Sequence, residues 1–335
     1  MNKIKYVDIV VGLCWGDEGK GKVVNALCNN NYDMVCRFNG GNNAGHTIYM
    51  NNKKYKTHLI PSGVFYGITS VIGPNCVVNV KAFFEELDYL KENGFMTDNI
   101  YISPKAHIIT DEHIDIDKQK YSHLGTTSRG IGPCYTDKVK RIGLQAKDVP
   151  ELKDYLWDGN LYGKILCEGA QGFRLDIDYG NYPYVTSSST LPYMACSLGF
   201  STIYIRNIIG CAKLYDTRSG VDPDFPSSLH DNEELKKIAI EGKEFGVTTG
   251  RGRIVNYLNL DKLIEAINIT GCNNIIISKC DILDKLNIFK LFYENEIHKY
   301  NNLESMKYDI INILTLKTDF LEEGNIIFSS SPTCI

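Results

Sequence analysis

The sequence has no run of apolar residues as long as the roughly 18 that a membrane-spanning helix needs. Its first residues also lack the apolar segment and small-residue cleavage site of a secretory signal. Positive charge is not in excess, because the 335 residues carry a net charge of −4 and no dense basic run. This balance argues against non-specific binding to nucleic acids. We therefore expect a cytoplasmic protein with small-molecule ligands, which binds neither nucleic acid nor membrane.

Cysteine and proline are present, but neither forms a recognisable framework. The 11 cysteines include no Cys-x-x-Cys pair and no tight cluster with histidine, which favours buried, reduced thiols over disulfides or a zinc site. The 10 prolines are not gathered in a linker, and no internal repeat or low-complexity tract marks a boundary. We expect residues 1–335 to form a single domain, with insertions at 111–121 and 147–164.

Short, β-branched apolar runs recur along the chain and alternate with helical patterns such as residues 82–91. The predicted strands are residues 7–13, 34–38, 77–80, 165–167, 203–211 and 274–278. This alternation predicts an α/β fold, with a mostly parallel central sheet flanked by helices.

Residues 12–22 read Gly-Leu-Cys-Trp-Gly-Asp-Glu-Gly-Lys-Gly-Lys and lie between an apolar run and a helical pattern. The order of strand, glycine-rich loop and helix is typical of a phosphate-binding loop. The spacing from Gly16 to Lys22 matches the first seven positions of a Walker A motif, but Val23 lacks the hydroxyl that would hold Mg²⁺. Asp17 would repel phosphate unless it binds the metal or accepts a proton. We therefore expect a P-loop-like fold whose loop takes part in catalysis.

A second glycine-rich segment, residues 39–47, follows the predicted strand 34–38. His46 near its end could donate to the negative charge on a transferring phosphoryl group. A lone histidine is more often structural, so the first loop is what makes His46 a catalytic candidate. We expect Asp17 and His46 to form an acid/base pair at the carboxyl ends of neighbouring strands, where open α/β sheets bind ligands.

Residues 15–22 and 43–47 together resemble motifs of the adenylosuccinate synthetase family. Further similar segments follow in the family's order at residues 58–63, 125–133, 137–139, 168–172, 176–180, 182–188, 245–251 and 278–284. The resemblance covers most of the chain and points to a short form of the family, similar in length to archaeal and viral members.

The resemblance implies ligation of L-aspartate to C6 of IMP, with GTP as phosphoryl donor and 6-phosphoryl-IMP as intermediate. The products would be adenylosuccinate, GDP and phosphate, which is a step of purine biosynthesis. Asp17 would remove the N1 proton of IMP, while His46 and Lys20 would stabilise the transferring phosphoryl group. Mg²⁺ would be held by Asp17 and the carbonyl of Gly45, in place of the missing Walker hydroxyl.

The resemblance also implies three sets of binding residues. For GTP the set is Gly16, Glu18, Gly19, Gly21, Lys22, Gly45, Thr47, Arg253, Lys279, Asp281 and Ser330. For IMP it is Asp17, Asn43, Thr127, Arg141, Gln171, Thr186 and Arg251. For aspartate it is Val247, Thr248, Thr249, Arg251 and Arg253. Arg141 would reach the partner's nucleotide across a homodimer interface, although an arginine in isolation is more often a solvated surface charge.

Two alternatives remain open. A viral branch of the family acts on dGMP to give 2-amino-deoxyadenylosuccinate, with ATP or GTP as donor, and it tends to lose the loop carboxylate that Asp17 supplies here. A non-catalytic GTP-binding switch could use the same loops, but it would not need Asp17 beside His46. Asn39 and Asn42 stand where the family more often has Gln and His. Base and sugar preference are left open, because one contact changes discrimination by only about 1–3 kcal/mol.

Overall fold

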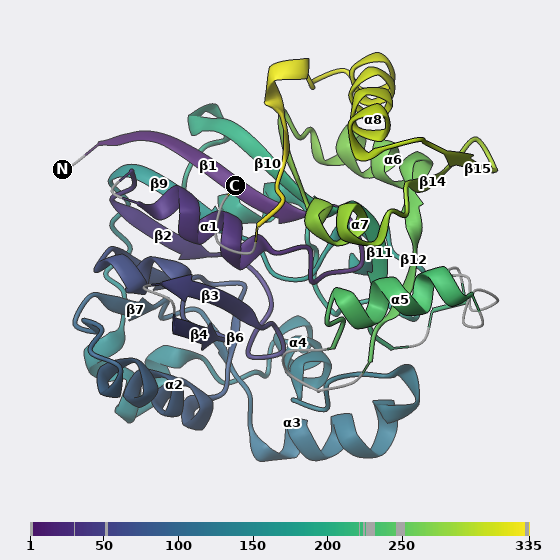
Figure 1. Cartoon of the computed structure of the whole chain (residues 1–335). Helices are drawn as coiled ribbons and strands as arrows, with labels where there is room; N and C mark the ends of the chain where they lie inside the picture. The colour runs from purple at the N-terminus through teal and green to yellow at the C-terminus, as the bar shows by residue number, and fades with distance from the viewer. Residues whose placement is uncertain are drawn as a thin grey trace.

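The computed structural model describes residues 3–29, 31–50, 53–220, 222–223, 225, 232–245, 252–331 and 335. In this part of the chain the central sheet has eight strands (Figure 1), in the order β16-β13-β10-β1-β9-β2-β5-β7. They are β1 (Ile4–Gly12), β2 (Met34–Arg37), β5 (Thr69–Ile72), β7 (Ile100–Ile102), β9 (Gly163–Glu168), β10 (Ile205–Lys213), β13 (Asn274–Ser278) and β16 (Ile326–Phe328). All their pairings are parallel, which confirms the predicted α/β class.

Five of the six predicted strands belong to this sheet, as β1, β2, β9, β10 and β13. The prediction for residues 77–80 is wrong in part: only β6 (Val77–Val78) is a strand, and it pairs with β8 (His107–Ile108) outside the central sheet. Val80 instead begins α2 (Val80–Glu92), because the Asn79 side chain caps that helix by accepting from the Ala82 N–H at 2.8 Å. The short strands β5, β7 and β16 have no predicted counterpart.

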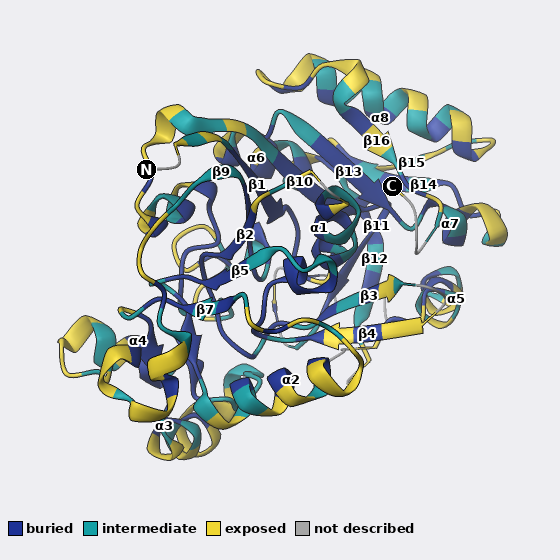
Figure 2. Cartoon of the chain, turned by 90° about the vertical axis from the view of Figure 1, so that its left-hand side faces the viewer, coloured by how far each residue is buried: buried dark blue, intermediate teal, exposed yellow. Residues whose placement is uncertain are grey.

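The central strands are apolar on both faces, and helices cover both. On one face, Val10 and Leu166 pack against Val23 and Val24 of α1 (Lys20–Cys28). The opposite face belongs to the largest core cluster, which includes the buried side of α6 (Leu260–Thr270). Figure 2 shows the central strands dark blue, whereas exposed residues gather on outer helices such as α2 and α8. Burial on both faces explains why these strands are continuous apolar runs.

The remaining elements surround this sheet (Figure 1). The other helices are α3 (Asp111–Ile116), α4 (Ile131–Lys140), α5 (Glu233–Glu241), α7 (Cys280–Leu286) and α8 (Leu303–Lys317). A second sheet contains β11 (Tyr215–Arg218), β12 (Ile254–Asn259), β14 (Lys290–Tyr293) and β15 (Glu296–Lys299), and β3 (His46–Met50) pairs with β4 (Lys53–Thr57). None of the described helices combines the length and apolarity needed to cross a membrane.

The strand order corrects one expectation about the site. Asp17 follows β1 and His46 comes after β2, but β9 lies between these two strands and pairs with both. The two residues therefore do not follow neighbouring strands. Order in a sheet depends on pairings between segments far apart in sequence, which local patterns do not reveal. The consequence is that Glu168, the last residue of β9, lies where its buried carboxylate can contact His46.

Candidate active site

The described residues form a cavity with a volume of about 900 Å³. Its walls include the two glycine-rich loops, together with segments that follow or flank α4, β9, β11, α5 and β13. Such a volume is at the upper end of the range for small-molecule sites. It is large enough for more than one ligand at a time.

Cations dominate the walls of this cavity, although the whole chain is net negative. Eight basic side chains line it, namely Lys20, Lys22, Lys54, Lys140, Arg218, Lys243, Arg253 and Lys279. The carboxylates that line it are Asp17 and Asp117. A concave surface with this excess of positive charge attracts ligands that carry several negative charges.

The first glycine-rich loop has the backbone shape of a phosphate-binding turn. Gly16, Asp17 and Gly19 have positive φ angles of 85°, 60° and 87°. Helix α1 then begins at Lys20, and no side chain caps its first N–H groups. Unpaired N–H groups at the start of a helix are a site for anions. Gly21 must remain glycine, since an added Cβ would lie 2.8 Å from the Cβ of His46.

Glu18 is not brought to the cavity, although it belongs to the predicted GTP-binding set. Its buried carboxylate lies behind the loop, where it accepts from the N–H groups of Cys14 at 3.1 Å and Gly16 at 2.8 Å. It also accepts from the Lys20 ammonium at 2.6 Å. Lys20 itself lines the cavity. Glu18 therefore holds the shape of the loop and the direction of Lys20.

Lys22 also lines the cavity, but its ammonium is engaged by the C-terminal segment. It donates to Ser329 Oγ at 2.6 Å and to the carbonyl of Ser331 at 2.9 Å. Burial lowers the pKa of Lys22. Ser330, between its two acceptors, is exposed and does not line the cavity. The contact ties the phosphate loop to the segment in which the sequence predicts nucleotide binding.

His46 is held by a carboxylate that sequence reasoning left without a role. His46 is 6% exposed, and its Nδ1 contacts Oε1 of the fully buried Glu168. Burial alone would raise the pKa of Glu168, but the His46 ring and the Arg37 guanidinium hold it below its ordinary value. The ionised carboxylate contacts Nδ1 and orients the ring, which leaves Nε2 as the nitrogen that can contact a ligand. The sequence feature that could have identified Glu168 as a site residue is its position. It begins the segment 168–172, directly after the predicted strand 165–167.

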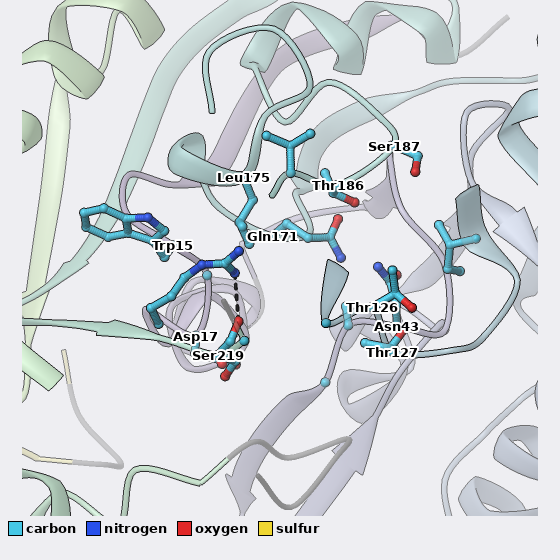
Figure 3. Close-up of a pocket in the computed structure, with 18 of the residues that line it drawn as sticks. Trp15, Asp17, Asn43, Thr126, Thr127, Gln171, Leu175, Thr186, Ser187 and Ser219 are labelled. Atoms are coloured by element: carbon cyan, nitrogen blue, oxygen red, sulfur yellow. Dashed lines mark hydrogen bonds between the residues drawn. The ribbon is translucent and has the colours of Figure 1, made fainter. Parts of the chain in front are cut away.

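Apart from Arg141, the described residues that were predicted for IMP line the cavity. Asn43, Thr127, Gln171 and Thr186 all line the cavity and are drawn in Figure 3. Oε1 of Gln171 is buried and has no hydrogen-bond partner among the described residues. Because a buried polar atom without a partner is costly, this amide suits a ligand that supplies a donor.

Asp117 was not predicted, yet it shapes the turn that carries Thr127. It accepts from Thr126 Oγ1 at 2.9 Å and from the Gly130 N–H at 2.8 Å. Asp117 lies in the expected insertion 111–121, and nothing in the sequence there indicates this role. Lys54, Lys140, Arg218 and Lys243 are likewise cavity residues without a sequence signal.

Several predicted residues do not line the cavity. Arg141 is exposed at the end of α4, and Asp281 is half-buried in the first turn of α7. Asn39 is fully buried and joins two loops by donating to the carbonyls of Ala170 and Ser189 at 3.2 and 3.1 Å. Asn42 is buried and also does not line the cavity. Val247, Thr248, Thr249 and Arg251 lie outside the described residues.

Asp17 and Gly45 both line the cavity and offer the oxygen donors that Mg²⁺ prefers. The described residues include no group of three or more His, Cys, Asp or Glu side chains that could hold a metal. A site with few protein ligands still fits Mg²⁺, because this ion usually keeps several waters and binds substrate phosphates.

Asp216 provides a test of the electrostatics beneath the first loop. It is fully buried on β11 and accepts from the Asn259 N–H at 2.8 Å, and burial raises its pKa to about 6. The unfolded carboxyl ionises near 3.8, so the folded state binds more protons between these values and stability falls as pH rises through them. We expect Asp216→Asn, which keeps an acceptor oxygen, to stabilise the fold by about 1–3 kcal/mol at pH 8.

Urea unfolding of both proteins at pH 8 and pH 4 measures this difference. The gain should disappear at pH 4, where the wild-type carboxyl is largely protonated in the folded state. A variant less stable than wild type at pH 8 would contradict the argument.

Comparison with known sequences agrees with this geometry. A family model for adenylosuccinate synthetase matches residues 9–158 and 152–318. The chain is 38% identical to the adenylosuccinate synthetase of Cytophaga hutchinsonii, over 91% of this chain and 84% of that protein. It is 37% identical to the enzyme of the same name from Malacoplasma penetrans, over 84% of this chain and 79% of that protein.

Solved structures show the same relationship. The fully ligated adenylosuccinate synthetase from Plasmodium falciparum superposes with a TM-score of 0.86 at 29% identity, covering 98% of each chain. The succinoaminodeoxyadenylate synthetase of cyanophage S-2L, bound to dGMP and dATP, shares the fold with a TM-score of 0.69 at 19% identity, over 92% of this chain and all of that one. This chain therefore belongs to the adenylosuccinate synthetase family, and it is a ligase that forms a carbon–nitrogen bond.

Proposed function

We propose that this protein joins L-aspartate to C6 of IMP with GTP as phosphoryl donor, releasing adenylosuccinate, GDP and phosphate. The observation that carries the proposal is a single cavity containing a loop carboxylate, Asp17, a histidine held by Glu168, and a strongly cationic wall. A nucleoside triphosphate, a nucleotide phosphate and a dicarboxylic amino acid all supply the negative charge that such a wall attracts. The names of its relatives support the same reaction.

In the proposed mechanism Asp17 accepts the proton from N1 of IMP, and the electron pair moves onto O6. This oxygen attacks the γ-phosphorus of GTP, and the bond from that phosphorus to the β–γ bridging oxygen breaks to release GDP. The amine of aspartate then attacks C6, and phosphate leaves with O6. His46, oriented by Glu168, donates to the charge on the transferring phosphoryl group, and Lys20 adds a fixed positive charge nearby.

Mg²⁺ would be held by the Asp17 carboxylate and the Gly45 carbonyl, and when bound it would neutralise charge on the β- and γ-phosphates. The first loop, with Gly16, Gly19, Gly21 and Lys22, would hold the triphosphate, and Thr47 would contribute its hydroxyl. The Thr47 Oγ1 atom is buried without a hydrogen-bond partner in the described chain, which supports this role.

We propose guanine as the base of the donor. Lys279 lines the cavity, and Asp281 two residues later would accept from N1–H and the 2-amino group of guanine. Adenine offers no such pair of donors, so a carboxylate at this position favours GTP over ATP. Ser330 would complete this subsite from the C-terminal segment. The substrates are those of nucleotide synthesis, so the proposal also places the enzyme in the cytoplasm.

The proposal includes a homodimer in which Arg141 reaches the partner's IMP. Arg141 lies in the exposed C-terminal turn of α4, between Val139 and Ile142, which are 80% and 70% exposed. Two apolar side chains beside an arginine are suited to burial against a second copy. Thr248, Thr249 and Arg251, with Val247, would hold the carboxylates of aspartate.

The shared site makes a specific prediction for Arg141→Leu. We expect the KM for IMP to rise at least tenfold, because a charge-assisted contact to phosphate is lost, with a smaller change in kcat. Mixing this variant with Asp17→Asn should restore activity, since a hybrid dimer would contain one site with both wild-type residues. Subunit exchange without recovered activity would contradict a site shared between subunits.

The activity itself is tested by phosphate release from the purified protein with Mg²⁺, aspartate and GTP. Release that requires IMP, aspartate and GTP together supports the proposal, and ATP should replace GTP poorly. A preference for dGMP over IMP would instead assign the 2-aminoadenine reaction, against which the retained Asp17 argues. GTP hydrolysis that ignores aspartate would reject a ligase of this kind.

A further inference from the structure

The carboxylate of Glu244 brings together basic groups from three other segments of the chain. It accepts from the Tyr215 hydroxyl at 2.6 Å and from Lys213 Nζ at 3.1 Å, where β10 leads into β11. It also accepts from Arg253 Nη1 at 2.6 Å, just before β12, and pairs with Lys279 Nζ at 3.8 Å, just after β13. Glu244 is 2% exposed and does not line the cavity. It therefore acts on the site only through its partners.

Two of these partners, Arg253 and Lys279, do line the cavity. Lys213 is buried away from it and donates to Thr217 Oγ1 at 2.7 Å. One carboxylate thus faces three cations, so this group has a net positive charge. The two cations that line the cavity present that charge to a ligand. The ammonium of Lys279 is further oriented because it donates to the carbonyl of Gly242 at 2.8 Å. Burial opposes ionisation of Glu244, but Lys213, Arg253 and Lys279 lower its pKa to about 2.

Arg253 lies between two carboxylates with different surroundings. Its Nε is 2.8 Å from Oδ2 of Asp17, whose side chain is 32% exposed, whereas Nη1 bonds the fully buried side chain of Glu244. In the proposed reaction Asp17 must accept a proton and contact Mg²⁺, so Arg253 has to release it. Glu244 cannot be reached from the cavity and keeps its contact. Arg253 can then turn from Asp17 toward an anionic ligand while Glu244 holds it.

The backbone around Glu244 supports the same role. The Arg253 N–H donates to the Glu244 carbonyl at 2.9 Å, and Phe245 forms an antiparallel bridge with Gly252. Glu244 and Arg253 are therefore joined by both backbone and side chain. In the sequence these contacts lie on either side of residues 246–251, which contain four of the five predicted aspartate-binding residues.

We propose that Glu244 is a positioning residue that holds Arg253 and Lys279 toward the phosphoryl donor and aspartate. This inference rests on the proposed function, and it concerns the donor and aspartate subsites, leaving the IMP subsite unaffected.

The test compares Glu244→Gln with Glu86→Gln. Both replace a buried carboxylate by its neutral isostere, but Glu86 bonds the N–H groups of residues 58–60 and does not line the cavity. We expect Glu244→Gln to raise the KM for GTP and for aspartate about tenfold each, equivalent to about 1.4 kcal/mol, with the KM for IMP within twofold. Glu86→Gln should leave all three KM values within twofold. Unchanged KM values for GTP and aspartate in folded Glu244→Gln overturn the proposal, as does an equal rise in all three.

Glu244→Gln leaves Lys213 buried without a counter-charge, which can prevent folding. The double variant Glu244→Gln/Lys213→Met removes both charges and is measured alongside. Calorimetric titration with GTP and Mg²⁺ provides a readout that does not require turnover. If wild type binds GTP but forms no adenylosuccinate, the proposed function fails. The affinity of the double variant for GTP then still tests the role of Glu244. We expect this affinity to be about tenfold weaker than that of wild type, and an unchanged affinity overturns the proposed role.

Discussion

Replacing Asp17 by asparagine is expected to lower kcat by about 10³-fold, within the 10²–10⁴-fold range of general base catalysis. The amide cannot accept the N1 proton, so O6 does not become a nucleophile. Asparagine is a matched replacement because it has the same shape and tolerates the φ of 60° that this position requires. Initial rates of phosphate release measure the effect.

The pH dependence of kcat distinguishes the loss of a general base from general damage to the active site. At high pH the N1 proton of IMP dissociates into solvent, so the kcat of Asp17→Asn should rise with pH while that of wild type levels off. The melting temperature serves as a control for folding, and the affinity for GTP without Mg²⁺ serves as a control for the first glycine-rich loop. A variant that keeps more than a tenth of wild-type kcat at neutral pH would remove Asp17 from the role of base.

Glu168→Gln is expected to have the second-largest effect, on activity and stability together. The neutral amide orients the His46 ring less firmly than the ionised carboxylate does, and we expect kcat to fall by about 10²-fold. The change also removes a negative charge near the buried guanidinium of Arg37 and weakens the hydrogen bonds that Glu168 accepts from Ser62. We expect the fold to lose about 1–3 kcal/mol, the cost of weakening the hydrogen bonds of a buried polar group. Chemical unfolding and initial rates measure the two losses.

A double-mutant cycle with His46→Gln tests whether the pair acts as a unit. If Glu168 works through His46, the double variant should lose little more kcat than His46→Gln alone. Independent, multiplying losses would show that Glu168 contributes to catalysis in some other way. Glu86→Gln again controls for the general cost of neutralising a buried carboxylate.

Much of the chemistry could be predicted from local sequence. The spacing of Gly16, Asp17 and Lys22 is what predicts phosphate binding by the first loop, because a phosphate-binding turn needs such residue types within a few positions. Five strands of the central sheet were also predictable, since a strand buried on both faces must be apolar throughout. Residues of the IMP set such as Gln171 and Thr186 were found through the family resemblance, and the cavity brings them together.

The sequence by itself determined the class of fold, the order of the motifs and the groups available for catalysis. Only the tertiary structure decided which groups meet. Placing β9 between β1 and β2 sets Glu168 against His46, and the buried pair of Lys213 and Glu244 organises Arg253 and Lys279. The physical reason is that phosphate-binding turns form from neighbouring residues, whereas a buried charge needs partners that strand pairing brings from distant parts of the chain.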